Sequence, residues 1–165
     1  MRKRGLAIGL VVTTILATGC ASGGGSGGGS APASRPASAP APLTGATAGA
    51  ATAQQSVEIF MRAVKAQDLQ TMSAVWGTSR GPAREQMDRE QLEKRLIIIQ
   101  CKLDHEAWGF AEDRPRLVAG GKQDFRVRLR SKTAEATTSF TTILGPENRW
   151  FVEIVDMEPL REFCT

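Results

Sequence analysis

The chain has 165 residues, 41% of them hydrophobic, which is enough for one globular domain of ordinary size. Its net charge of +4 does not indicate a nucleic-acid partner, because Arg2, Lys3 and Arg4 stand at the very start of the chain. Beyond these three residues, basic and acidic side chains nearly balance.

The N-terminal stretch has the pattern of an export signal. A basic start is followed by an apolar run from Leu6 to Leu16, which is shorter than the roughly 20 residues that cross a bilayer. Residues 16–20, Leu-Ala-Thr-Gly-Cys, resemble the lipobox of bacterial lipoproteins, with Ala17 where leucine is more common. The resemblance implies that residues 1–19 are a removable signal peptide and that Cys20 is lipidated. The alternative is an ordinary signal peptide that is cut nearby, with Cys20 an incidental thiol.

Residues 20–51 are predicted to form a linker between this anchor and a folded domain. After Cys20 the segment consists almost entirely of Gly, Ser, Ala, Thr and Pro. Such a composition cannot bury a core, so we expect the segment to stay disordered and to hold the domain away from the bilayer. Because Ala21 is not acidic, the lipoprotein resemblance implies the periplasmic side of the outer membrane rather than the outer leaflet of the cytoplasmic membrane.

Two helices are predicted at the start of the folded domain, which spans residues 52–165. Thr52 and Gln55 have the spacing of a capping box, and apolar residues then recur at helical spacing over residues 57–64. Asp68 is a good N-cap for a second and shorter helix that extends to about Trp76.

A third helix is expected over residues 83–100, after a break at residues 77–82 that contains Gly and Pro. Its apolar residues again recur on one side. The β-branched stretch at residues 96–99 is an alternative start for a strand.

About four strands are predicted after the helices, because the apolar pattern changes to period two. In the clearest of them, Phe125, Val127 and Leu129 alternate with three arginines. In the last strand, Trp150, Val152 and Ile154 are expected on the concave side, and Phe151 and Val155 on the other face. The candidate segments are residues 103–111, 116–119, 125–130, 135–144 and 149–156. The predicted fold class is therefore α+β, with three N-terminal helices packed on a curved, mostly antiparallel four-stranded sheet.

This order of elements resembles the nuclear transport factor two-like superfamily, a cone-shaped α+β fold that includes polyketide cyclase-like proteins. The resemblance is carried by residues 57–64, 68–76 and 148–154. It implies a fold with an internal pocket but no particular reaction. The chain lacks tyrosine, which the ketosteroid isomerases of this superfamily use, and the Asp–Arg–Asp set of its epoxide hydrolases cannot be placed on inward strand positions. Five aromatic residues are candidates either for a pocket lining or for an ordinary core: Phe60, Trp76, Trp108, Phe110 and Trp150.

The remaining cysteines predict a disulfide between Cys101 and Cys164, because exported proteins fold where such bonds persist. Two free thiols are the alternative. The chain has a single histidine, His105, and no second histidine or free cysteine that could bind a metal ion together with it. No metal site and no cofactor are therefore expected. We expect His105 on the surface or on an edge strand.

Arg126, Arg128 and Arg130 form the most notable polar feature, since alternation places all three guanidinium groups on one strand face. This row is a candidate surface for an anionic partner. The alternative is a solvated sheet face whose arginines pair across strands with acidic groups such as Glu153.

The sequence thus predicts an exported, membrane-anchored lipoprotein whose domain binds another envelope component or a small ligand, with no catalysis expected. Two copies of the chain that associate through the sheet as a homodimer are a further candidate interaction. The alternatives are a hydrolase or isomerase of the cone-fold superfamily, or an accessory lipoprotein of outer-membrane assembly or secretion. No P-loop, GxSxG or dinucleotide-binding motif occurs in the sequence.

Overall fold

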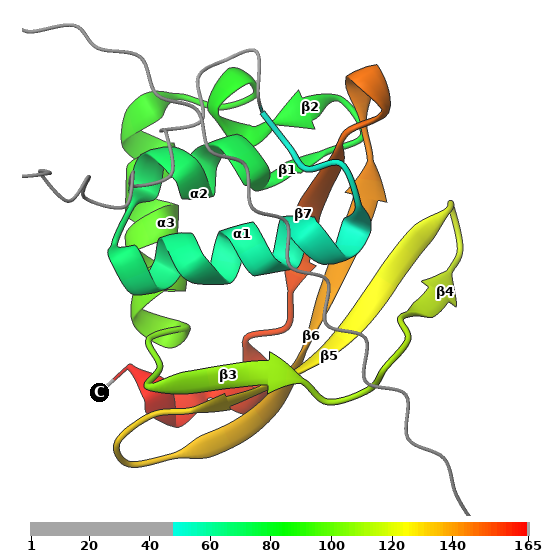
Figure 1. The fold of residues 1–165 in the computed structure, drawn as a ribbon. Coiled ribbons are helices and arrows are strands. Elements are labelled where there is room, and N and C mark those ends of the chain that lie inside the picture. Colours follow the sequence, from blue (N-terminus) through cyan, green and yellow to red (C-terminus); the bar gives the residue numbers. More distant parts are fainter. Residues whose placement is uncertain (1–47, 165) are drawn as a thin grey trace, which may run out of the picture. The chain divides into compact units, whose positions relative to one another are not determined.

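The computed structural model describes residues 48–164, which form three α-helices and a five-stranded sheet (Figure 1). The mixed α+β class and the antiparallel pairing of the strands are confirmed, but the predicted number of four strands was wrong. The strand order is β3-β5-β6-β7, and the short β4 also pairs with β5 as the fifth strand. The strands are β3 (Ala107–Phe110), β4 (Arg116–Val118), β5 (Lys122–Arg130), β6 (Glu135–Leu144) and β7 (Trp150–Val155).

The first two helices begin at the residues that the capping signals indicate. Helix α1 (Ala53–Ala66) starts after Thr52, whose side chain accepts a hydrogen bond from the Gln55 amide at 3.1 Å. Helix α2 (Leu69–Val75) starts after Asp68, which accepts hydrogen bonds from the Thr71 amide and hydroxyl. The fold already includes residues 48–51 of the predicted linker, because the amide of Ala50 donates to the Trp150 carbonyl at 2.8 Å.

The Asp68 cap makes the start of α2 sensitive to acid. Burial acts to raise the pKa of this carboxyl, but hydrogen bonds from the Thr71 hydroxyl and from the Thr71 and Gln70 amides outweigh it and hold the pKa below its usual value. A pKa lowered by folding means that the cap's contribution to stability is complete above the unfolded pKa of about 3.9. It is lost as the pH falls through the lower folded value.

The third helix starts later than predicted. Helix α3 spans Arg89–Lys102, whereas Ala83–Glu85 form a separate 3₁₀ segment, η2. The side chain of Asp88 accepts hydrogen bonds from the Glu90 and Gln91 amides, so the helix is capped there. The β-branched residues 96–99 are helical, which excludes the alternative of a strand at this position.

The main core lies between the helices and one face of the sheet. Phe125, Val127 and Leu129 of β5 point into it and are at most 5% exposed, as their alternation predicts. The helices contribute fully buried residues such as Phe60 and Leu96. In Figure 1, α1 runs across the sheet, and α2 and α3 lie together on the side of the sheet where β7 is the last strand.

A second, smaller apolar layer covers part of the opposite face of the sheet. Phe151 and Ile143 are cross-strand partners there and are 2% and 9% exposed. The short hairpin formed by β1 (Gly77–Thr78) and β2 (Gly81–Pro82) packs against this end of β7, where the sequence indicated only a break. The fold therefore buries apolar side chains on both faces of β7.

The last strand departs from strict alternation. Trp150 and Val152 face the main core, but Ile154 is 54% exposed, and Val155 packs against the main core, so the placement predicted for these last two residues was wrong. The reason is a register shift: Thr142 pairs with Val152, whereas its neighbour Thr141 pairs with Ile154. Glu153 is therefore an extra residue in β7, and each residue after it lies on the face of the sheet opposite to the one that strict alternation predicts.

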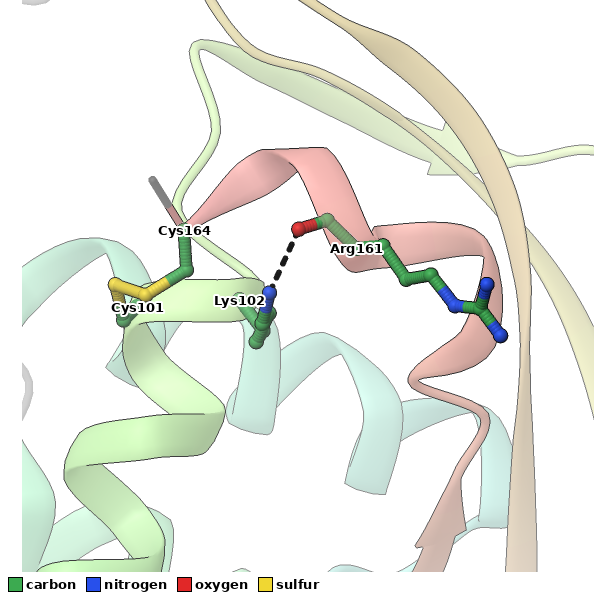
Figure 2. Close-up of a disulfide and its surroundings, with 4 residues drawn as sticks. All are labelled: Cys101, Lys102, Arg161 and Cys164. Atoms are coloured by element: carbon green, nitrogen blue, oxygen red, sulfur yellow. Dashed lines mark hydrogen bonds between the residues drawn. A yellow bond between two sulfur atoms is a disulfide. The ribbon is translucent and has the colours of Figure 1, made fainter.

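The predicted disulfide is present in the structure. Cys101, in the last turn of α3, is bonded to Cys164, and their Cα atoms lie 5.4 Å apart (Figure 2). The 3₁₀ segment η4 (Glu158–Phe163) precedes Cys164. In Figure 2 the Lys102 ammonium also reaches this segment and donates to the Arg161 carbonyl at 2.8 Å. Two links therefore hold the C-terminal segment to the end of α3.

Candidate functional site on the outer face of the sheet

The arginine row of β5 lies on the face of the sheet opposite to the main core. Arg128 and Arg130 are exposed and Arg126 is half-buried. On β6 their partners are Ser139, Thr137 and Glu135, and on β3 Gly109 pairs with Arg128 and Ala107 with Arg130. We call the surface formed by Arg126, Arg128, Arg130, Gly109 and Glu135 the arginine face.

Few acidic groups neutralise this surface. Arg128 Nε lies 3.8 Å from Glu135 Oε1, at the outer limit of an ion pair, and both side chains are more than half exposed. Within residues 48–164, Arg126 and Arg130 form no ion pair. Because exposed pairs contribute little, the arginines remain available to an anionic partner.

Glu153 does not neutralise the arginine row, so that part of the prediction was wrong. Its Oε2 atom lies 2.6 Å from Lys122 Nζ, and these two side chains are 17% and 28% exposed. The same oxygen lacks a partner in hydrogen-bond geometry among the described residues, so the contact is a close ion pair rather than an aligned hydrogen bond. The pairing of β7 with β6 places Glu153 near Thr141 and Thr142, which pair with the β4 end of β5, whereas Arg130 pairs at the other end of β6.

A shallow groove of about 360 Å³ is formed by β3 together with residues of the neighbouring strands β5 and β6. Arg128, Arg130 and Glu135 line it together with the β3 residues Ala107–Phe110. Gly109 leaves it open, because a Cβ atom at this position would meet nothing within 4 Å. Sequence reasoning identified the arginines but missed Gly109 and Glu135, since only the strand register brings them to the same surface.

The five candidate aromatic residues are mostly core components. Phe60 is fully buried and packs edge-on against Phe140, and Trp76, Trp108, Phe110 and Trp150 are half-buried against the same core. The Trp108 and Phe110 rings lie 5.5 Å apart, and those of Phe110 and Phe125 lie 5.6 Å apart. All five residues therefore lie in the core or pack against it.

One cavity of about 340 Å³ does adjoin Trp150 and Phe125, at the N-terminal end of α1. Its other lining residues are small or neutral, and no ionisable side chain is among them: Ala51, Thr52, Ala53, Gln54, Pro115 and Gln123. The lining of this cavity therefore offers no titratable side chain of the kind that general acid–base chemistry uses.

His105 is buried rather than exposed, contrary to prediction. It is 4% exposed, and its Nδ1 atom donates a hydrogen bond to the Leu103 carbonyl at 2.8 Å. Its own carbonyl accepts a hydrogen bond from the Lys65 ammonium. These contacts give His105 a structural role in fixing the turn between α3 and β3. Over residues 48–164, no group of three or more His, Cys, Asp or Glu side chains is placed to hold a metal ion.

The cysteine predicted to carry lipid, Cys20, lies outside the described residues. Of the helices that the structure describes, none has the length and apolarity needed to cross a membrane. Comparison of the chain with protein-family models, with curated proteins and with solved structures finds no match.

Proposed function

We propose that this chain is an exported lipoprotein, anchored through lipidated Cys20, whose folded domain binds another envelope component through the arginine face. The export signal and the disulfide both support a location outside the cytoplasm. The neutral lining of the cavity beside Trp150 and the weakly neutralised cationic surface favour binding over catalysis. The observation that carries the proposal is the exposed pair Arg128 and Arg130 beside the open groove at Gly109.

The same surface gives little support to a two-fold homodimer through this part of the sheet. A two-fold axis would bring two copies of this patch together, and each copy carries three arginines against one glutamate, so two net positive surfaces would meet. Like charges across an interface are unfavourable. A partner with acidic groups is the better complement, and guanidinium groups bind carboxylates and phosphates in a bidentate manner.

Photo-crosslinking in the cells that make this protein tests the arginine face. A photoreactive side chain at Thr137, which pairs with Arg128, should form an adduct with the partner. Arg126→Gln combined with Arg130→Gln should reduce this adduct at least about tenfold, because charge-assisted hydrogen bonds each contribute about 1.5–3 kcal/mol. Stability should change by less than about 1 kcal/mol, since both side chains lack ion pairs within the described fold.

The matched control is Arg62→Gln combined with Arg95→Gln, which removes the same charge from exposed positions on α1 and α3. This variant should retain the adduct. Gly109→Ala places a methyl group in the groove without a clash inside the domain, and should weaken the adduct while the fold remains stable. Equal adduct yields in the arginine-face and control variants would refute the proposal, and an adduct of two copies of this chain would replace it with a homodimer.

A further inference from the structure

A cavity of about 240 Å³ is lined by residues of α2, η2 and α3, none of which belongs to the arginine face. Three leucines form its apolar part: Leu69, Leu92 and Leu96. The polar part is formed by Gln70, Ser73, Arg84, Arg89 and Glu93. The cavity therefore combines an apolar wall with two guanidinium groups and one carboxylate.

The two guanidinium groups differ in their partners. Arg89 Nε lies 2.8 Å from Glu93 Oε1 in a solvent-exposed ion pair, in which the two side chains are 84% and 42% exposed. Arg84 forms no ion pair within residues 48–164. Its Nη2 atom is buried and has no hydrogen-bond partner among those residues.

A buried donor atom without a partner is unfavourable, because it has lost water without gaining an acceptor, although Arg84 as a whole is only partly buried. An anion bound against the exposed side of the Arg84 guanidinium would supply the missing negative charge. Because Nη2 is enclosed by the protein, a carboxylate in the cavity would accept a charge-assisted hydrogen bond from the guanidinium nitrogens that remain accessible. A ligand that also has an apolar part would bury the surface of the neighbouring leucines, which is favourable.

We propose that this cavity binds a short-chain monocarboxylate, with the carboxylate on Arg84 and the hydrocarbon chain against Leu69, Leu92 and Leu96. The small volume restricts the ligand to a few carbon atoms, because pockets for drug-sized molecules begin at about 300 Å³. This site is separate from the arginine face and does not rest on the function proposed for that surface.

Isothermal titration of the full chain with hexanoate tests the site. Saturable binding is expected, and hexanol, which has the same chain without the charge, should bind at least about tenfold more weakly. Inorganic phosphate, which has no apolar part, should also bind more weakly than hexanoate. Arg84→Met should lower hexanoate affinity at least about tenfold, whereas Arg95→Met, on the exposed side of α3, should leave it unchanged.

Glu93→Gln provides a second test that keeps Arg84 in place. It removes a negative charge from the cavity wall, so hexanoate should bind more tightly than it does to the unaltered chain. The proposal is overturned if hexanoate does not saturate the unaltered chain at millimolar concentration, if hexanol or phosphate binds equally well, or if Glu93→Gln weakens binding.

Discussion

Phe151→Ala is expected to lower the free energy of unfolding by about 3–5 kcal/mol, the range for a phenylalanine removed from a well-packed core. The ring is 2% exposed although it lies on the face of the sheet opposite to the main core. Two glycines from separate segments lie so close to the ring that neither position has room for a side chain. A Cβ atom at Gly49 would lie 2.8 Å from Phe151 Cζ, and one at Gly145 would lie 2.7 Å from Phe151 Cε2. The alanine variant would leave a cavity that these tightly placed segments cannot fill by small shifts.

Chemical denaturation measures this difference directly. Ile154→Ala is the matched control, because this residue lies on the same strand and the same face but is 54% exposed, and its loss should cost less than about 1 kcal/mol. Equal losses in the two variants would contradict the second apolar layer. If the Phe151→Ala variant is as stable as the unaltered chain but no longer associates with a partner molecule, Phe151 instead belongs to a partner-binding surface.

Removal of the disulfide by Cys101→Ser combined with Cys164→Ser is expected to lower the free energy of unfolding by about 4 kcal/mol. This value follows from the 63-residue separation of the two cysteines in the chain-entropy account of cross-links. The loss should be seen as a lower denaturation midpoint, and the same loss should follow when the unaltered protein is reduced. Without the disulfide, only weaker contacts hold η4 in place, so its amide hydrogens should also exchange faster with solvent.

Lys102→Met provides the control for this second prediction. It removes the hydrogen bond from the Lys102 ammonium to the Arg161 carbonyl but leaves the disulfide intact, so stability should fall by about 1 kcal/mol or less. Two reactive thiols in the denatured but unreduced protein would show that Cys101 and Cys164 are not bonded.

Local signals predicted much of the fold. Thr52 and Asp68 begin helices because their side chains satisfy amides of the first turn, and these contacts depend only on neighbouring residues. The alternation in β5 likewise separated Val127 from Arg128 correctly, because this strand has no register shift. Such features can be read from a short window of sequence.

Features that depend on distant pairing could not be predicted. The exposure of Ile154 results from the extra residue in β7, and nothing within the sequence of that strand indicates a bulge. The groove at Gly109 exists because β3 pairs with β5 in one particular register. The start of α3 at Arg89 depends on a cap by Asp88 that competes with helical periodicity further upstream. The unpartnered guanidinium of Arg84 likewise follows from packing of three separate segments.

Export of this protein and its attachment to a membrane through Cys20 are tested most directly by the intact mass of the protein isolated from its own cells. We predict a chain that lacks residues 1–19 and carries acyl groups on Cys20, and a Cys20→Ser variant that lacks the added lipid and leaves the membrane fraction. A native chain that retains residues 1–19, or one cut elsewhere without lipid, would contradict the claim.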